Sequence, residues 1–322
     1  MNVLVTGGAG YIGSVCAESL IEAGHTVTVL DNLSEGHRSG VDPRARFVGV
    51  CLSQQEETRR AVLAAAPEAV IHFAASALVG ESMRFPEKYF RNNVASALNL
   101  LDAAREAGIR KFVFSSTCAT YGMPDRLPIT EDTPQHPINP YGESKFMFER
   151  ILDWHGKLHG LEFVAFRYFN VAGASHKYGE HHRVETHLVP RVLRVALGKE
   201  AHCEIYGTDY PTPDGTCIRD YIHVSDLVRA HIQALAPGIQ GFYNLGNGEG
   251  SSVRQVIRAC ELVTGRPIKA IERPRRPGDP ARLVASSEKA ERDLHWKPEI
   301  PRIEDIVASA WRWHQAHPNG YP

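Results

Sequence analysis

Residues 2–13, which read NVLVTGGAGYIG, decide the fold of this chain. Asn2 to Thr6 is a short apolar run with β-branched residues, which predicts a β-strand. Glycines follow at once, and apolar residues then recur at helical spacing from Ile12 to Ala23. A strand, a glycine-rich turn and a helix in this order place phosphates on the helix N-terminus. The stretch therefore predicts a dinucleotide-binding unit.

Three glycines and one acid make this turn specific. Gly7 and Gly10 let the backbone turn and approach a pyrophosphate, while Gly13 lets the helix pack on the strand. The next predicted strand, 26–30, leads into Asp31, 18 residues after Gly13, close to the separation expected of a ribose-binding carboxylate. Asp31 would bind both ribose hydroxyls and repel a 2′-phosphate, so NAD is expected rather than NADP. The alternative is an ordinary glycine loop with an aspartate cap, which the flanking strand and helix disfavour.

Tyr141 and Lys145 form a second motif, which indicates proton transfer. Pro140 starts a predicted helix that runs to about Leu158, so the two side chains lie one turn apart on the same face. A free tyrosine, with a pKa of about 10, is a poor base near neutrality. A nearby ammonium and the charge of an oxidised nicotinamide favour phenolate, which makes Tyr141 a usable general base. Thr117, after the neighbouring strand, can share the substrate proton. A surface Tyr-Lys pair is the alternative for this motif taken alone.

Alternation of strands and helices predicts an α/β fold with a doubly wound parallel sheet, the Rossmann arrangement. Strands are expected near 2–6, 26–30, 44–48, 69–73, 110–114 and 161–166, and helices near 12–23, 55–65, 87–107 and 141–158. After residue 170 the pattern breaks, with helices near 188–197, 224–236 and 252–264 and a strand at 241–245. This part predicts a smaller, mixed α/β substrate-binding lobe.

Composition excludes several classes of partner. The chain has 322 residues and a net charge of −1, so it is large enough for two domains, and neither a nucleic acid nor a membrane surface is an expected partner. It has no 18-residue apolar run and no signal peptide, and its six cysteines lack Cys-x-x-Cys spacing. These features predict a cytoplasmic protein with reduced thiols. The His181-His182 pair favours a solvated loop over a metal site, and no metal is expected.

Ten stretches carry a family resemblance that covers nearly the whole chain. They are Thr6–Gly13, Asp31–Leu33, His72–Ala75, Val79–Ser82, Asn92–Val94, Ser115–Thr117, Tyr141–Lys145, Arg167–Asn170, Asp214–Val224 and His317–Pro322. With these motifs the chain resembles the extended short-chain dehydrogenase/reductase family and, within it, the UDP-glucose 4-epimerases. The last two stretches are the most specific to the epimerases.

The resemblance implies reversible C4 epimerisation of UDP-glucose and UDP-galactose. Tyr141 would remove the 4-hydroxyl proton as hydride leaves C4 for bound NAD, and the 4-keto sugar would turn over and be reduced on its other face. The resemblance also implies a UDP-sugar as partner, a homodimer, and some turnover of the N-acetylated pair. It places the NAD-binding domain at 1–170 plus about 224–265, and the UDP-sugar-binding lobe at about 171–223 plus 266–322.

The same resemblance assigns site residues by position. The catalytic residues are Tyr141, Lys145 and Thr117. The NAD-binding residues are Gly7, Gly10, Tyr11, Ile12, Gly13, Asp31, Asn32, Leu33, Ser34, Cys51, Leu52, Phe73, Ala74, Ala75, Asn92, Ser115, Tyr141, Lys145 and Phe169. The substrate-binding residues are Thr117, Tyr141, Asn170, His187, Leu188, Tyr206, Arg219, Arg276, Asp279 and Leu283. Without the resemblance, each lobe residue would be interpreted as a structural salt bridge or turn, and 273–278 as an exposed basic turn.

Some positions depart from the family pattern. Cys51 replaces the usual aspartate beside the adenine, 73–77 lacks a lysine that some relatives have near the nicotinamide, and His187 replaces an asparagine. Leu283 occupies the position whose bulk limits the group at sugar C2, although it could instead be a core residue.

Two other functions remain as alternatives. One is a different nucleotide-sugar epimerase, dehydratase or decarboxylase. A dehydratase or decarboxylase would need an acid beside Thr117, where this chain has Cys118 and Ala119. The other is a non-catalytic NAD-binding regulator, which would not need Tyr141 and Lys145.

Overall fold

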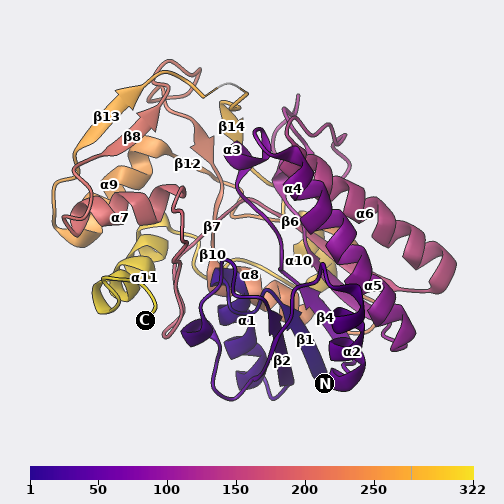
Figure 1. Ribbon diagram of the computed structural model, residues 1–322. Helices are drawn as coiled ribbons and strands as arrows, with labels where there is room; N and C mark the ends of the chain where they lie inside the picture. The colour runs from indigo at the N-terminus through magenta and orange to yellow at the C-terminus, as the bar shows by residue number, and fades with distance from the viewer. Residues whose placement is uncertain (277) are drawn as a thin grey trace.

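A seven-stranded parallel sheet organises the larger part of the molecule. The computed structural model describes residues 1–276 and 278–322 (Figure 1). The strand order is β11-β6-β5-β4-β1-β2-β3, and it reverses between β1 and β4, where doubly wound folds bind dinucleotides. The predicted doubly wound sheet is therefore confirmed. The strands are β1 (Asn2–Thr6), β2 (Thr26–Asp31), β3 (Arg46–Gly49), β4 (Ala69–His72), β5 (Lys111–Ser115), β6 (Glu162–Tyr168) and β11 (Gly241–Leu245).

Helices cover both faces of this sheet, because successive strand residues point to opposite sides. In β1, Val3 and Val5 belong to one apolar core and Leu4 to the other. The first core includes α1 (Tyr11–Glu22), α8 (Val224–Gln233) and α10 (Glu288–Leu294), and the second includes α2 (Gln55–Ala65), α5 (Ser96–Glu106) and α6 (Pro140–His159). The buried β1 strand is thus held from both sides, directly below the glycine turn.

The helix expected at 87–107 is divided into three parts. It begins with α4 (Pro86–Phe90), widens into the π-helical turn η2 (Arg91–Ala95) and continues as α5. Asn93, in the wide turn, accepts a hydrogen bond from the N–H of Ser76 at 2.8 Å and donates to the Ser76 carbonyl at 2.9 Å. The side chain also donates to Ser144 Oγ on α6 at 3.0 Å. The π turn therefore fixes the loop after β4 beside α6, and π turns are frequent at functional sites.

A third apolar core defines the smaller lobe. Helices α7 (Leu188–Ala196), α9 (Val253–Thr264) and α11 (Ile303–Ala316) pack together and against β8 (Cys203–Tyr206). In Figure 1 they lie to the left of the sheet, with the parallel pair β8 and β13 above them. The remaining elements are α3 (Val79–Ser82), η1 (Arg38–Gly40), η3 (Cys118–Thr120), β7 (Asn170–Ala172), β9 (Ile218–Arg219), β10 (Tyr221–His223), β12 (Ser251–Ser252), β13 (Ala270–Arg273) and β14 (Arg282–Leu283).

The packing divides the chain differently from the expected boundaries at two helices. Residues 224–265 were expected to join the sheet, and α8 and β11 do so. The last element of that segment, α9, instead buries Val256 and Cys260 in the core of the smaller lobe. Conversely, α10, from the segment expected in the lobe, packs Ala290 and Leu294 into the sheet core. Periodicity predicted the α9 helix, but it does not say against which partner an apolar face packs.

Two features of the whole chain bear on its environment. None of the helices in the described ranges combines the length and the apolar content that a bilayer crossing needs. All six cysteines carry free thiols, and Cys16, Cys203, Cys217 and Cys260 are buried.

Candidate active site

The glycine turn forms a close-fitting cradle at the start of α1. Gly7 has a φ of +70°, and a Cβ on it would stand 2.6 Å from the amide nitrogen of Ala74 in the loop after β4. A Cβ on Gly13 would stand 2.2 Å from the Gly7 carbonyl oxygen. Gly10 is the N-cap of α1 and supplies no side-chain cap, so the first N–H groups of the helix, at Tyr11 and Ile12, remain available to an anion. The cradle fits the pyrophosphate of a dinucleotide.

Asp31 lies beside this cradle at the end of β2. Its Oδ2 accepts a hydrogen bond from the Ala9 N–H at 3.0 Å, and its Oδ1 accepts one from the Leu33 N–H at 2.7 Å. Burial raises the pKa of this carboxyl, and the backbone hydrogen bonds from Leu33 and Ala9 oppose the rise. The side chain is thereby oriented by two backbone donors and retains lone pairs for a ribose diol.

Cys51 and its neighbours lie next along this edge. The Asn32 amide donates to Cys51 Sγ at 3.4 Å, and Ser53 Oγ lies 3.0 Å from the same sulfur. Burial would raise the pKa of this thiol, but the hydrogen bonds from Ser53 and Asn32 outweigh it and lower the pKa. The Leu52 carbonyl is fixed by Asn99 Nδ2 at 2.9 Å. Cys51 thus already has polar partners within the protein.

The loop after β4 lies on the opposite side of the glycine turn. Phe73 continues the line of β4, and its ring lies 4.9 Å from that of His231. Asn92 donates to Ser76 Oγ at 3.0 Å, so both asparagines of the π turn contact this loop. Phe73, Ala74, Ala75 and Asn92 are therefore brought to one place, as the resemblance implied. Leu33 and the exposed Ser34 continue the loop after Asp31, where the Ser34 N–H bonds to Asn32 Oδ1 at 3.0 Å.

Tyr141, Lys145 and Thr117 meet at the carboxyl end of β5. Lys145 Nζ donates to the Ser115 carbonyl at 2.7 Å and lies 4.8 Å from the centre of the Phe114 ring. Burial lowers the pKa of Lys145 to about 7, against the opposing charge of Glu149. Burial also raises the pKa of Tyr141 to about 12, while a hydrogen bond with Thr117 opposes the rise.

These pKa values refine the expected chemistry of the tyrosine. Lys145 was expected to favour the phenolate of Tyr141, yet burial acts on Tyr141 in the other direction. The protein's own groups therefore hold Tyr141 as a neutral phenol at pH 7. The positive charge that a bound oxidised nicotinamide brings is the element that would lower its pKa.

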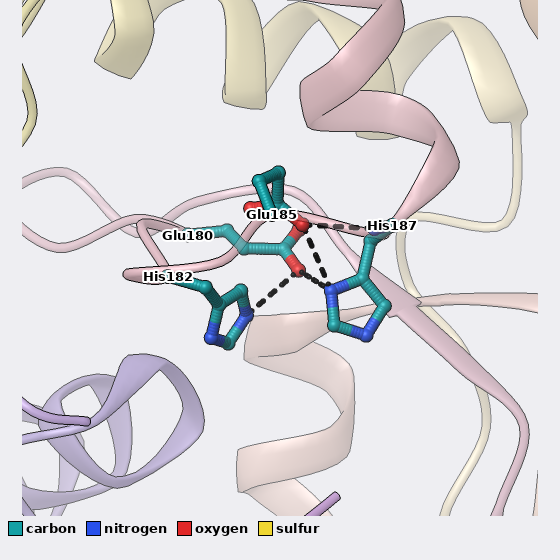
Figure 2. Close-up of side chains that lie close together, drawn as sticks. All are labelled: Glu180, His182, Glu185 and His187. Atoms are coloured by element: carbon teal, nitrogen blue, oxygen red, sulfur yellow. Dashed lines mark hydrogen bonds and ion pairs between the residues drawn. The ribbon is translucent and has the colours of Figure 1, made fainter. Parts of the chain in front are cut away.

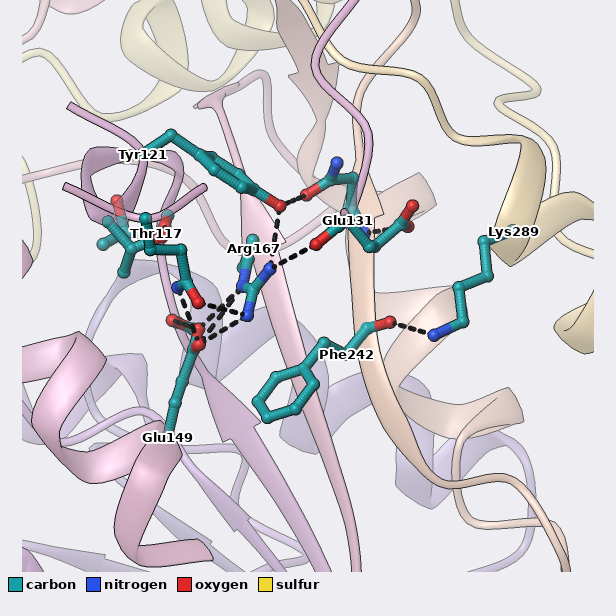
Figure 3. A network of polar contacts seen from close by, with 11 residues as sticks. Thr117, Tyr121, Glu131, Glu149, Arg167, Phe242 and Lys289 are labelled. Atoms are coloured by element: carbon teal, nitrogen blue, oxygen red, sulfur yellow. Dashed lines mark hydrogen bonds and ion pairs between the residues drawn. The ribbon is translucent and has the colours of Figure 1, made fainter. Parts of the chain in front are cut away.

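A buried polar network holds the catalytic helix against the strands (Figure 3). Arg167 Nη2 on β6 and Glu149 Oε2 on α6 are 2.7 Å apart, and both side chains are at most 3% exposed. The Ser116 hydroxyl donates to the other oxygen of Glu149, and Arg167 Nη1 donates to Tyr121 Oη at 2.9 Å. The network ties α6 to the residue between Ser115 and Thr117, so it fixes the register of Lys145 and Tyr141 against Thr117.

Sequence reasoning missed four residues around the tyrosine. Tyr168 shares a short hydrogen bond with Ser115 Oγ, and Tyr89 lies edge-on to Tyr141 with ring centres 6.3 Å apart. Asn93 and Glu149 are the other two. Glu149 lies one helical turn after Lys145, which was the available signal, and Tyr168 lies in the quoted 167–170 motif without having been given a role.

The residues expected to bind substrate fall into two groups. In the lobe, the Arg276 guanidinium lies 3.9 Å from the centre of the Tyr206 ring, and Arg219 Nη2 lies 2.5 Å from Asp279 Oδ1. Leu283 is paired with Arg219 between β14 and β9. These five residues are thus gathered at one place, but they contact one another. Leu283 also packs against the small cluster of Phe169, Tyr121, Ile129 and Ala285, with Cys118.

The second group lies on β7 and at the start of α7. The Asn170 N–H on β7 bonds to the Asp220 carbonyl at 2.9 Å. His187 is the N-cap of α7, and its Nδ1 lies 3.0 Å from Glu180 Oε1 and 3.1 Å from Glu185 Oε1. Leu188 follows it and packs against the lobe core. Although burial opposes it, the charge of Glu180 raises the pKa of His187.

A doubly wound sheet with a glycine cradle, a ribose acid and a Tyr-Lys pair defines a nicotinamide-dependent enzyme of the extended short-chain dehydrogenase/reductase type. The sequence profile of the NAD dependent epimerase/dehydratase family matches residues 3–246. The chain belongs to this family.

Individual relatives agree with the family over their full length. The chain is 49% identical to the UDP-glucose 4-epimerase of Lacticaseibacillus casei, covering 100% of this chain and 99% of that protein. It is 51% identical to the UDP-glucose 4-epimerase of Streptococcus mutans with the same coverage. The crystal structure of the UDP-glucose 4-epimerase from Bifidobacterium longum, in complex with NAD+ and UDP, superposes with a TM-score of 0.94 at 39% identity and covers all of both chains.

Proposed function

We propose that this chain interconverts UDP-glucose and UDP-galactose by inverting the configuration at C4 of the hexose. The observation that carries the proposal is the meeting of Tyr141, Lys145 and Thr117 at the end of β5, with Lys145 bonded to the Ser115 carbonyl at 2.7 Å. When bound in the glycine cradle, NAD supplies a hydride acceptor that later returns the hydride. The full-length likeness to UDP-glucose 4-epimerases supports this substrate pair.

The side chains of the site would handle the proton and hold the sugar. As the phenolate that the charge of bound oxidised nicotinamide would favour, Tyr141 Oη would take the proton of the 4-hydroxyl, and it would return that proton to the C4 oxygen when hydride returns to C4. Thr117 shares this proton, as its hydrogen bond with Tyr141 suggests. Lys145, whenever it is protonated, adds positive charge that favours the phenolate form of Tyr141 before the transfer. The cradle, Asp31 and the loop after β4 would hold the two nucleotide halves of the cofactor.

The lobe residues would anchor the UDP group. Tyr206 offers a ring for the uracil, Arg219 and Arg276 offer forked donors to the diphosphate, and Asp279 accepts from the ribose. Because Arg276 lies on Tyr206 and Arg219 pairs with Asp279, these contacts would rearrange when UDP binds. Asn170, His187 and Leu188 would face the diphosphate and sugar from the other side. Anchoring through UDP leaves the hexose free to present either face.

The neighbours of Thr117 disfavour a dehydratase. Elimination of water needs a proton donor beside the oxidised sugar. Cys118 follows Thr117, and burial raises the pKa of its thiol to about 12. Ala119 has no proton to give. A non-catalytic regulator is disfavoured because Lys145, only 2% exposed, is a costly residue to bury without a function.

A product assay tests the proposal. Tag-free protein is incubated with UDP-galactose and, separately, with UDP-glucose, and the products are separated by anion-exchange chromatography and weighed by mass spectrometry. We expect each sugar to give the other at unchanged mass, and Tyr141→Phe to give almost none. A product lighter by one water would indicate a dehydratase. Protein that holds NAD but converts neither sugar would indicate a regulator.

The oligomeric state and the compartment are further parts of the proposal. Helix α6 exposes Met147, Trp154 and Leu158, which are spaced by seven and four residues and are 39%, 57% and 68% exposed. This spacing puts them on one helix face, and an apolar stripe of this kind supports a homodimer. We expect light scattering to show a dimer that Trp154→Glu dissociates. If the Trp154→Glu variant remains a dimer, the interface lies elsewhere on the protein. Free thiols support a cytoplasmic location.

A further inference from the structure

Four side chains converge in the segment that leads into α7, outside the residues that handle the proton. Glu180, His182, Glu185 and His187 each direct one donor atom to a common point, and these four atoms lie within 4.8 Å of one another. Figure 2 shows the rings of His182 and His187 on either side of the Glu180 carboxylate. His182 Nε2 lies 3.1 Å from Glu180 Oε1, and His187 Nδ1 lies 3.0 Å from the same oxygen.

The spacing of the four donor atoms also permits a tetrahedral metal. Ligands at about 2.0–2.1 Å from a zinc ion are about 3.3 Å apart along each edge of the tetrahedron. Three of the distances between donor atoms of these four residues are 3.0–3.1 Å. The widest of the distances, at most 4.8 Å, would have to shorten by about 1.5 Å to reach that edge length. His187 Nδ1 lies within 3.1 Å of both carboxylates, and one N–H cannot point directly at both.

The charge of the cluster also calls for a cation. Glu180 and Glu185 side chains are only 5% and 6% exposed, so two carboxylates approach each other away from water. A metal binds histidine only as neutral imidazole, and two neutral imidazoles with two carboxylates carry a charge of −2, which one divalent ion neutralises in place of a proton on His187. Imidazole favours zinc and other transition metals, whereas magnesium and calcium prefer oxygen ligands alone.

We propose that Glu180, His182, Glu185 and His187 form a binding site for a divalent transition metal, with zinc the best match. A cavity of about 260 Å³ borders the cluster and is lined by Glu180, Glu185, Arg194 and His314 among others. This cavity gives an ion a path from solvent. The proposal rests on the donor set and not on the epimerase activity, although a metal bound to His187 Nδ1 would leave only the other ring nitrogen of His187 for the substrate contact proposed above.

The metal would act as a clamp between the two parts of the molecule. His182 lies edge-on to Tyr11, the first residue of α1, with ring centres 6.4 Å apart. Tyr11 Oη in turn donates to the Gly173 carbonyl at 2.7 Å. At the other end of the cluster, His187 caps α7. A metal held by all four residues would fix the segment 180–187 between the glycine cradle and the lobe.

Metal titration of the full chain tests this site. Tag-free protein is stripped with a chelator, dialysed, loaded with Zn²⁺ and desalted, and the metal is counted by plasma mass spectrometry. Co²⁺ is added to a parallel sample, because a tetrahedral site gives it an intense visible absorption. The test variants are His182→Ala and Glu185→Gln. His181→Ala is the matched control, since His181 is the adjacent histidine but faces His37 instead.

We expect about one zinc per chain in wild type and control, and binding weaker by about tenfold or more in the two test variants, as for other changes at metal sites. A tetrahedral Co²⁺ spectrum should accompany it. Retention well below one zinc in wild type, or equal loss in His181→Ala, would overturn the proposal. If His182→Ala fails to fold, His182→Gln and the wild-type Co²⁺ spectrum decide, and an octahedral spectrum rejects the site.

Discussion

The catalytic edge of the sheet and the substrate lobe are built in contrasting ways. At the edge, Lys145, Ser115 and Thr117 are at most 7% exposed, and a buried network of Glu149, Arg167 and Ser116 holds them. In the lobe, Arg219 bonds to Asp279 and to the backbone carbonyls of Ile218 and Pro280, and these residues lie on two-residue strands and loops. The chemistry therefore rests on a rigid frame, while UDP would bind to groups that must exchange partners.

This contrast suits an enzyme that must rotate its substrate. Proton transfer depends on positions fixed to a fraction of an ångström, which strand ends and a packed helix provide. A pocket that accepts both faces of a hexose needs a firm hold on the nucleotide and loose contact with the sugar. The following experiments test whether rigidity and function are divided in this way.

Removal of the Tyr141 hydroxyl should give the largest effect. Tyr141→Phe keeps the ring and removes the group that takes the proton, so we expect turnover to fall about a hundredfold or more, with bound NAD unchanged. Tyr243→Phe, on β11, removes a hydroxyl that donates to the Gln240 carbonyl, and it should leave turnover near wild type. Tyr141→Phe turnover within tenfold of wild type would contradict the assignment of the base.

Breaking the buried ion pair should show how rigid the edge is. Glu149→Gln leaves Arg167 uncompensated in the core, and the loss of one partner of such a pair costs about 3–5 kcal/mol of unfolding free energy. Glu106→Gln breaks the exposed pair with Arg59, in which both side chains are more than 40% exposed, and should cost far less. Urea unfolding curves compare the two. Similar midpoints for both variants would show that the network does not stabilise the edge.

A pH series should isolate the buried lysine. The pKa of Lys145 is about 7 in the fold and 10.5 in its ordinary state, so the unfolded chain binds more protons between these values. The free-energy cost of burying Lys145 therefore falls as the pH rises across this window, and the free energy of unfolding increases. Relative to Lys145→Met, the unfolding free energy of wild type should increase by about 2 kcal/mol from pH 7 to pH 9. Lys157→Met, at a lysine 60% exposed on the same helix, should show no such trend.

The contrast also explains how much the sequence revealed. The glycine spacing, Asp31 and the Tyr141–Lys145 pair predicted the parallel sheet, because each is a local signature of one element, and they led to the site proposed at its carboxyl edge. The sequence did not predict that Asn92 and Asn93 would open a π turn toward Ser76, since periodicity alone favoured one continuous helix.

Long-range partners account for what was missed. Arg167 and Glu149 are 18 residues apart and meet only when β6 and α6 pack. Glu180 and His187 were visible as single residues, but their convergence depends on the path of a loop without regular structure. The packing of α9 against α7 and α11 was missed because the apolar periodicity of a helix does not show which other element the apolar face contacts.

Substitution of Asp31, the proposed ribose-binding residue, tests whether the cofactor site is as rigid as the edge of the sheet. Asp31→Ala removes the carboxylate that Ala9 and Leu33 orient, so NAD affinity should fall about tenfold, the scale of one hydrogen bond to a charged group. Discrimination against NADP should relax, because the repulsion of a 2′-phosphate is lost. Calorimetric titration of stripped protein with both cofactors measures this. Unchanged NAD binding with no gain of NADP would exclude Asp31 as the ribose ligand.

The smallest effect is expected at Leu283, where the lobe meets the sugar. Leu283 packs against the cluster that contains Phe169 and Tyr121, so part of the side chain is core, and the rest would limit the space at sugar C2. Leu283→Tyr adds bulk there, and we expect it to lower turnover of the N-acetylated UDP-sugars several-fold more than that of UDP-glucose and UDP-galactose, because one misfitting group costs about 1–3 kcal/mol. Leu283→Met keeps the volume and should leave the ratio between the two pairs unchanged. Equal losses on both pairs in Leu283→Tyr would show that Leu283 serves the core alone, and that the lobe selects its sugar elsewhere.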